Sequence, residues 1–396
     1  MAVPTINAVI NFSTGPSFAQ AMILGTGILD VNVLADSTAV IVDVSDQINY
    51  IQTSRGRNAL VDQFQTGQLT LRIVDQNGDF NPTNPTGPYV GLLTPMKKVQ
   101  ISATYGATTY SLFSGFITSY VNTQPKDATE VAYTTIQAVD AFRLAQNAQI
   151  STVTGASAGD LSGTRINQIL DQIDWPATMR DVDAGLTTMQ ADPGTARTSL
   201  DAMTTVATSE YGALYVNTDG EFVFQDRAVT AGSIGGTVTT FNDDGTGISY
   251  ANAMWKLDDN LIFNSAQVSR AGGSPQTAIN QASIDKYFIH SYNLQDLLMQ
   301  TDAVALDYAQ AYVASRAETQ VRCDGIELDF FDPIRIVTTQ PGGSTLDNTL
   351  QIFGVATTIT PNSFRVFFTT LEPVIDALIL DNTTGYGTLD YNVLSY

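Results

Sequence analysis

Apolar and polar side chains alternate without a break along residues 68–74, and few folds can accommodate such a segment. Leu69, Leu71 and Ile73 fall on one face of an extended chain, and the side chains between them are polar. A two-residue period is that of a β-strand with one buried face. The segment therefore predicts a sheet that covers a core on one side.

Further segments of this kind occur before residue 140. They lie at 40–44, continuing irregularly into 50–51, and at 99–105, 110–120 and 131–139. Several connections between them are of hairpin length, and Gly106 and Gly115 predict a turn and a strand bend. The first 148 residues are therefore expected to form an antiparallel sandwich or barrel.

A segment of different character follows. Residues 164–175 carry apolar side chains at helical spacing and stop before Pro176, and Asp192 with Pro193 predicts the start of a second helix. A hairpin is expected at 213–224. The sequence thus predicts a β-rich α+β protein, with a β-block at 1–148, an α+β insertion at 149–230, a second β-block at 231–374 and a tail at 375–396. A helix capped by Thr301 is expected near 301–316.

Charge and composition exclude several functions. Acidic residues outnumber basic ones 39 to 18, for a formal charge of −21, which disfavours a grip on DNA phosphates. With one cysteine, Cys323, and one histidine, His290, neither an internal disulfide nor a Cys/His zinc site can form. A Cys–His catalytic pair has no supporting motif, and a buried Cys323 is favoured. No signal peptide or apolar run of about 18 residues is visible, so a soluble protein made in a cytoplasm, without a membrane-spanning segment, is expected.

One segment resembles a calcium loop. Asp75, Asn77 and Asp79 alternate as oxygen ligands do, but Gly78 is at the fourth position and Thr86 replaces the bidentate glutamate. A hairpin turn at Asn77-Gly78 is favoured, with calcium as the alternative. The carboxylate pairs at 243–244 and 258–259 are interpreted as solvated loops. No phosphate loop or nucleophile elbow is present, so neither a cofactor nor a catalytic residue is expected.

Two further features concern the β-blocks. Phe113-Ser-Gly115 and Phe353-Gly354 each lie in a strand–turn–strand pattern, a faint echo that fits two similar barrels. The basic triplet Arg55-Gly56-Arg57 is expected to pair with carboxylates within the fold or at a subunit contact.

The ordered series of motifs resembles the minor tail proteins of long-tailed, non-contractile bacteriophages, in particular those of actinobacterial phages. The residues that carry it are Arg57, Phe64, Gly67, Asn77, Gly78, Phe80, Pro82, Phe113 and Gly115. Segments 211–227 and 389–394 fit the same family.

The resemblance implies a tail-hub protein similar to the baseplate hub of contractile tails, located in the virion tail tip and assembled in the host cytoplasm. It implies two tail-tube-like β-barrels around an α+β insertion, and a homotrimer whose six barrels continue the tail tube. The implied partners are the distal tail protein, the tape measure protein and other tip proteins, while genomic DNA passes without specific binding. An acidic lumen suits that passage. The chain is too short for the added lytic domain that some relatives carry.

Three alternatives remain. A hexameric distal tail protein would share the tube-like fold. A glycan hydrolase of the host wall would need an Asp/Glu pair as acid and base. A carbohydrate-binding module could use Trp175 and Trp255 as stacking platforms, although both are favoured as packed residues.

Overall fold

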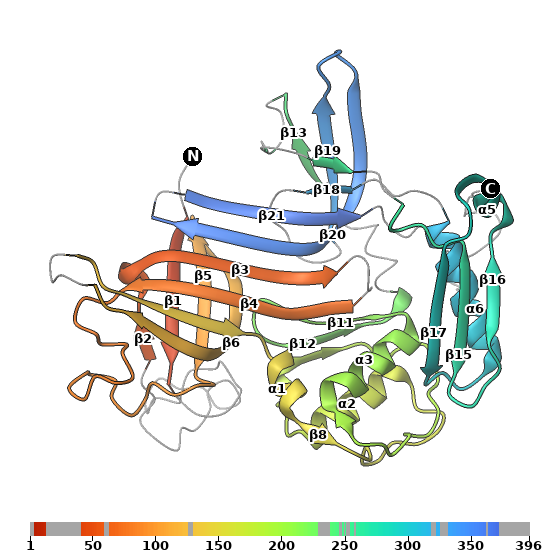
Figure 1. Cartoon of the computed structure of the whole chain (residues 1–396), viewed down its shortest axis with the longest axis horizontal. Coiled ribbons are helices and arrows are strands. Elements are labelled where there is room, and N and C mark those ends of the chain that lie inside the picture. Colours follow the sequence, from red (N-terminus) through yellow and green to blue (C-terminus); the bar gives the residue numbers. More distant parts are fainter. Residues whose placement is uncertain are drawn as a thin grey trace.

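A large curved sheet dominates the molecule (Figure 1), with a helical unit at one end of it and a small sheet backed by a helix beyond. The computed structural model describes residues 4–12, 41–58, 63–125, 130–228, 238–244, 248, 250, 254–256, 259–317, 322–324, 332–361 and 363–371. The sequence also predicts a strand at 326–331. This segment, residue 258 and the tail at 375–396 lie outside the described ranges, as does the side chain of Cys323.

The first half of the large sheet contains seven strands in the order β3-β4-β7-β6-β5-β1-β2, all antiparallel to their neighbours. The elements are β1 Thr5–Asn11, β2 Ile41–Asp43, the 3-10 turn η1 Ser45–Gln47, β3 Ile48–Asn58, β4 Gln63–Val74, β5 Lys98–Tyr105, β6 Thr108–Thr123 and β7 Tyr133–Val139. The expected strands of this region are present.

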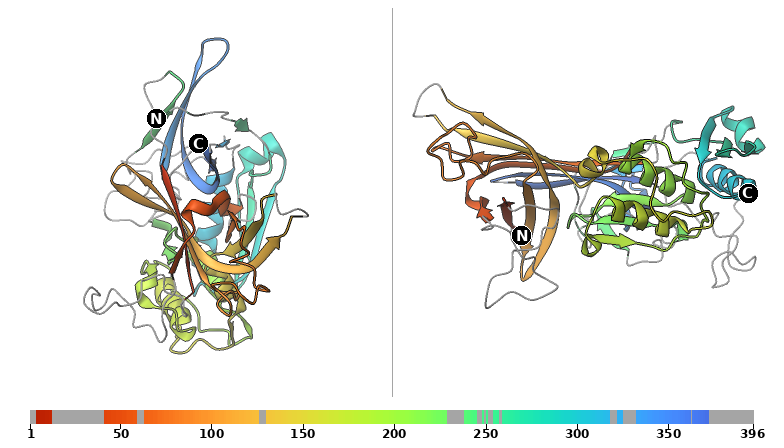
Figure 2. Two further views of the ribbon diagram at one scale, coloured as in Figure 1. Left: turned by 90° about the vertical axis from the view of Figure 1, so that its left-hand side faces the viewer. Right: turned by 90° about the horizontal axis from the view of Figure 1, so that it is seen from below.

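The apolar face of β4 is buried as its alternation predicts, because Leu69, Leu71 and Ile73 are at most 2% exposed. They pack with Ile10 of β1, Ile101 of β5 and other apolar side chains in one core. Strands from both sides of this half contribute to that core, so the sheet curls around it, and Figure 2 shows this curl from below.

The predicted hairpin turn at Asn77-Gly78 is wrong. β4 pairs with β3 and β7, and the chain crosses residues 75–97 before β5 begins. Gly78 does adopt a positive φ of 67°. A local turn signal cannot tell a hairpin from a bend inside a longer loop, and here long-range strand pairing decides.

The middle of the chain forms three helices and short strands. They are α1 Phe142–Asn147, β8 Gln149–Ile150, α2 Ser162–Gln172, η2 Ala177–Met179, β9 Arg180–Val182, β10 Arg197–Thr198, α3 Ser199–Glu210, β11 Ala213–Val216 and β12 Phe222–Gln225. Ile166, Ile169 and Leu170 of α2 are fully buried, as the helical spacing predicts. The hairpin formed by β11 and β12 is confirmed.

The predicted N-cap of α3 is wrong. Thr198, not Asp192, caps the helix, and its Oγ1 accepts the backbone N–H of Asp201 at 3.0 Å. Asp192 instead pairs with Arg197 and accepts the N–H groups of Val153 and Gly194. This carboxylate therefore fastens a loop ahead of the helix.

The rest of the chain completes the large sheet and adds the outer unit. Its elements are β13 Thr239–Asn242, β14 Met254–Lys256, β15 Ser265–Arg270, β16 Gln276–Ile279, α5 Gln281–Tyr287, β17 Ser291–Leu297, α6 Asp302–Arg316, β18 Arg322–Asp324, β19 Pro333–Thr339, β20 Thr345–Thr360 and β21 Ser363–Leu371. The Thr301 cap of α6 is confirmed, because its Oγ1 accepts the N–H of Val304. Tyr308 and Tyr312 of α6 pack on the sheet of β15, β16 and β17.

The large sheet is mixed and open within the part that the structure describes. Its path runs from β14 to β2, the pair β13–β19 is parallel, and no described strand closes either half into a barrel. The antiparallel pairing expected of the first β-block is confirmed, whereas the same expectation for the second β-block is wrong at β13–β19. The two-barrel arrangement stays a prediction.

Candidate functional site

The two halves of the large sheet repeat one strand order. The first half reads β3-β4-β7-β6-β5-β1, and the second reads β14-β18-β21-β20-β19-β13. In each half a 16-residue strand lies in the middle, β6 in the first and β20 in the second. The strand order therefore occurs twice, although the last pair differs in direction: β1–β5 is antiparallel and β13–β19 is parallel.

The pairing register repeats as well. Phe116 in β6 pairs with both Lys98 and Val139, which belong to β5 and β7. Gln351 in β20 likewise pairs with both Pro333 of β19 and Leu371 of β21. Near its middle, each long strand thus passes from one paired neighbour to another.

A β-bulge follows this point in both halves. The register shifts between Ile117 and Ser119 in β6, and between Ile352 and Gly354 in β20. Ser119 therefore corresponds to Gly354. The Phe–Gly echo predicted from sequence falls on these corresponding strands but out of register, because Gly115 lies before the exchange point and Gly354 after it.

The two halves join where β3 lies along β20. The antiparallel register runs from Gly354 opposite Gly56 to Ile359 opposite Ile51. A Cβ atom on Gly56 would lie 2.4 Å from the Gly354 Cα and 2.6 Å from the Phe353 carbonyl oxygen. Gly56 also has a φ of 141°, so this contact between backbones requires glycine. We call this pairing of β3 with β20 the seam.

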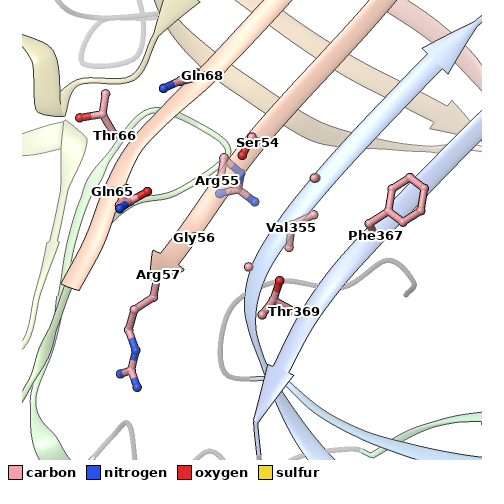
Figure 3. A pocket seen from close by; sticks show the side chains of 12 residues that line it. Ser54, Arg55, Gly56, Arg57, Gln65, Thr66, Gln68, Val355, Phe367 and Thr369 are labelled. Atoms are coloured by element: carbon pink, nitrogen blue, oxygen red, sulfur yellow. The ribbon is translucent and has the colours of Figure 1, made fainter. Parts of the chain in front are cut away.

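A pocket of about 320 Å³ opens on the seam (Figure 3). Its walls come from four adjacent strands: β3 and β4 of the first half, and β20 and β21 of the second. The lining residues are Ser54, Arg55, Gly56, Arg57, Gln65, Thr66, Gln68, Gly354, Val355, Ala356, Phe367 and Thr369. The lining is mostly polar and includes no carboxylate.

Several residues of the predicted motif meet around the seam. The guanidinium of Arg57 lies 4.4 Å from the centre of the Phe353 ring, so a first-half cation rests on a second-half aromatic residue. Phe64 packs against Tyr215 of β11 with ring centroids 5.2 Å apart. The motif thus connects three parts of the chain, a role that its order in the sequence does not reveal.

Gly67 contacts a buried carboxylate. Its N–H donates to Asp140 Oδ2 at 2.5 Å, and Asp140 Oδ1 accepts the N–H of Phe142 at the start of α1. A Cβ on Gly67 would lie 2.8 Å from Oδ2. Burial raises the pKa of Asp140 to about 7, although both N–H groups and the charge of Arg55 act to lower it.

We expect Asp140→Asn to reduce the loss of stability with rising pH between about 4 and 7. A carboxyl group with a raised pKa in the folded state stabilises the fold below its unfolded pKa, and this contribution is lost as pH rises through the folded value. The slope is at most about 1.4 kcal/mol per pH unit. Urea unfolding at several pH values measures it. Asp347→Asn is the control. Because Arg335 lowers the pKa of Asp347, removing the Asp347 carboxyl group should leave the slope of stability between about pH 4 and 7 unchanged. Equal slopes in the wild type and Asp140→Asn would contradict this role.

The Asp75 loop is organised by its own carboxylate. Asp75 accepts the N–H groups of Asp79 at 2.7 Å and Phe80 at 3.2 Å, and the hydroxyl of Thr134 at 2.7 Å. Its oxygens therefore point at protein donors, and Asn77 is exposed. No group of three His, Cys, Asp or Glu side chains able to hold a metal occurs among the described residues.

The remaining motif residues pack in the core, lie on a loop or allow two strands to approach closely. Phe80 is buried and packs on Tyr89 with ring centroids 5.0 Å apart, while Pro82 is exposed on the same loop. Phe113 is in the first-half core. A Cβ on Gly115 would lie 2.5 Å from the Val139 carbonyl oxygen, which explains the glycine there.

The residues proposed for other functions are dispersed. Trp175 is buried and donates from Nε1 to the Met179 carbonyl at 2.9 Å, and Trp255 packs on the core of the second half. Asp243 accepts from the N–H and hydroxyl of Thr339. Neither tryptophan is thus an open platform for a sugar.

The whole arrangement has solved counterparts. A prophage MuSo2 43 kDa tail protein from Shewanella oneidensis superposes with a TM-score of 0.56 at 12% identity, covering 94% of this chain and 99% of that one. A tail protein from Neisseria meningitidis MC58 gives 0.56 at 10% identity, covering 83% and 97%. The chain shares the fold of these two tail proteins. No family model matches its sequence, and neither does any curated protein. None of the described helices combines the length and apolar character needed to cross a membrane.

Proposed function

We propose that this chain is a non-enzymatic structural protein of a phage tail tip. Three copies would form a hub ring that continues the tail tube and joins the distal tail and tape measure proteins. The ring would anchor host-binding tip proteins, and genomic DNA would pass through it without specific binding.

The observation that carries the proposal is the shared fold, which extends over nearly the full length of both solved tail proteins. The repeated strand order adds support, since two equivalent units in each of three copies supply six units for a sixfold tube. The net charge of −21 suits a passage that must not bind DNA.

The domain division belongs to the same proposal. Residues 1–148 and 231–374 would each supply one tube-like unit, with 149–230 as the insertion between them and 375–396 as a tail. The motif residues near the seam, Arg57, Phe64 and Gly67, would hold the units together rather than bind a ligand.

The mass and symmetry of the purified chain test this function. Native mass spectrometry is expected to show three chains, and averaged electron micrographs a ring with six similar lobes in threefold symmetry. A ring of six chains would instead identify a distal tail protein. A chain that stays monomeric at every concentration and clears host cell wall on a zymogram would replace the structural role with an enzymatic one.

A further inference from the structure

The repeat leaves one strand edge without its counterpart. In the second half, β20 continues past β19 along one edge, and β3 covers this continuation. In the first half, β6 continues past β5 in the same way, but the described residues provide no strand beside 118–123 on that side. Among the described residues, backbone hydrogen bonds on this edge end at Ile117, which donates its N–H to the Lys97 carbonyl and accepts the N–H of Met96.

The composition of this edge fits a strand that receives a partner. Residues 118–123 contain no charge and no proline, and Val121 is 49% exposed. Proteins protect an unused edge with lysine, proline or bulges. The bulge before Ser119 is not such a protection, because β20 carries the same bulge and still pairs with β3.

The repeat also identifies the partner strand. β3 is the strand at the seam end of the first half, and β14 has the equivalent place in the second half. Among the described strands, β14 pairs only with β18. Within the described part of the chain these two edges do not pair, and β18, β21, β20, β3, β4 and β7 separate β14 from β6 in the open sheet.

We propose that β14 of one copy pairs antiparallel with β6 of a second copy, repeating the seam between chains. This inference rests on the proposed ring. It adds the interface that would close the ring, with alternating seams within and between chains.

The register follows from the equivalent pairs. Met254 pairs with Asp324, and Asp324 with Thr369. Gln52 has the equivalent position in the first half, because Gln52 pairs with Thr70 and Thr70 pairs with Gln137. Because Gln52 lies opposite Thr358 at the seam, Met254 is expected opposite Thr123 of the partner copy. Two residues further along, Lys256 is expected opposite Val121.

A disulfide tests this register. In a Cys323→Ser background, Val121→Cys with Lys256→Cys places two thiols directly opposite, about 4.5–5.5 Å apart at Cα, which a disulfide spans. Mild oxidation of the assembled full-length protein is expected to convert most chains into covalent multimers of up to three on a non-reducing gel. The control, Thr123→Cys with Lys256→Cys, places the thiols on a diagonal about 7–8 Å apart and should cross-link at least about tenfold less.

Hydrogen exchange on the unmodified protein gives a second readout that does not depend on the variants folding. A peptide covering 117–123 should exchange at least about tenfold more slowly in the ring than in dilute monomer. Three chains by native mass, with neither cross-linking nor protection, would overturn the pairing and leave the ring intact. A chain that never assembles would overturn both proposals.

Discussion

Gly56→Ala should destabilise the protein by about 2–6 kcal/mol, a large part of the stability of a typical domain. Two effects combine. The added methyl group would lie only 2.4 Å from the Gly354 Cα, and overpacking of this kind costs about 1–3 kcal/mol. The φ of 141° adds about 1–3 kcal/mol of backbone strain for any residue with a Cβ. Urea unfolding of the purified variant measures the sum.

Two alanine controls separate these causes. Gly106 also has a positive φ, of 62°, but no atom lies within 4 Å of a Cβ built there, so Gly106→Ala should cost about 1 kcal/mol. A Cβ on Gly354 would lie 3.3 Å from the Thr369 Cβ, so Gly354→Ala should cost about 1 kcal/mol or less. If Gly56→Ala unfolds no earlier than Gly106→Ala, the seam is looser than its contacts imply.

The sequence predicts elements well where one local period decides them. The alternation in β4 and the helical spacing in α2 each require burial of one face, and any fold of this chain must satisfy that requirement. The same holds for the Thr301 cap of α6, because a helix start needs acceptors within its own first turn.

Errors arise where a distant group competes with a local signal. Asn77-Gly78 is a good hairpin signal, but Asp75 binds Thr134 of a strand far along the chain, and β4 takes its partners elsewhere. Asp192-Pro193 is a good signal for a helix start, but the Asp192 carboxylate pairs with Arg197 and accepts the N–H of Val153 instead.

The candidate site could be predicted only in part. Arg57, Phe64 and Gly67 stand out as a motif, yet their contacts include Phe353, Tyr215 and Asp140, and nothing local links these residues. The need for glycine at position 56 follows from its pairing with Gly354, which no local pattern in the sequence links to it. The repeat of strand order is a property of pairing, and its two copies share almost no residue pattern.

Glu210→Ala should destabilise the protein by about 3–5 kcal/mol, because it removes the acceptor for four donors at a fully buried position. Glu210 Oε2 accepts the Ser162 hydroxyl at 2.8 Å and the N–H groups of Thr187 and Leu186 at 2.7 and 3.2 Å. Oε1 pairs with Arg227 at 3.1 Å. The Glu210 carboxylate therefore links the end of α3 to the start of α2, to the loop at 186–187 and to Arg227 after β12. Thermal and urea unfolding measure the loss.

Glu221→Ala is the matched control, because that half-buried carboxylate accepts a side-chain bond from Asn217 alone and should cost about 1 kcal/mol.

A double-mutant cycle shows whether the loss comes from the ion pair or from the backbone donors. Arg227 also donates to the Thr187 hydroxyl at 2.6 Å, so it keeps a partner when Glu210 is removed. If the ion pair dominates, Glu210→Ala with Arg227→Ala should be less destabilising than the sum of the two single changes, by about 1–3 kcal/mol. If the donors at 162, 186 and 187 dominate, the two changes should add within about 0.5 kcal/mol. The three bonds to Oε2 against one to Oε1 favour the second result, because an unsatisfied buried N–H or hydroxyl costs about 1–3 kcal/mol whether or not Arg227 is present.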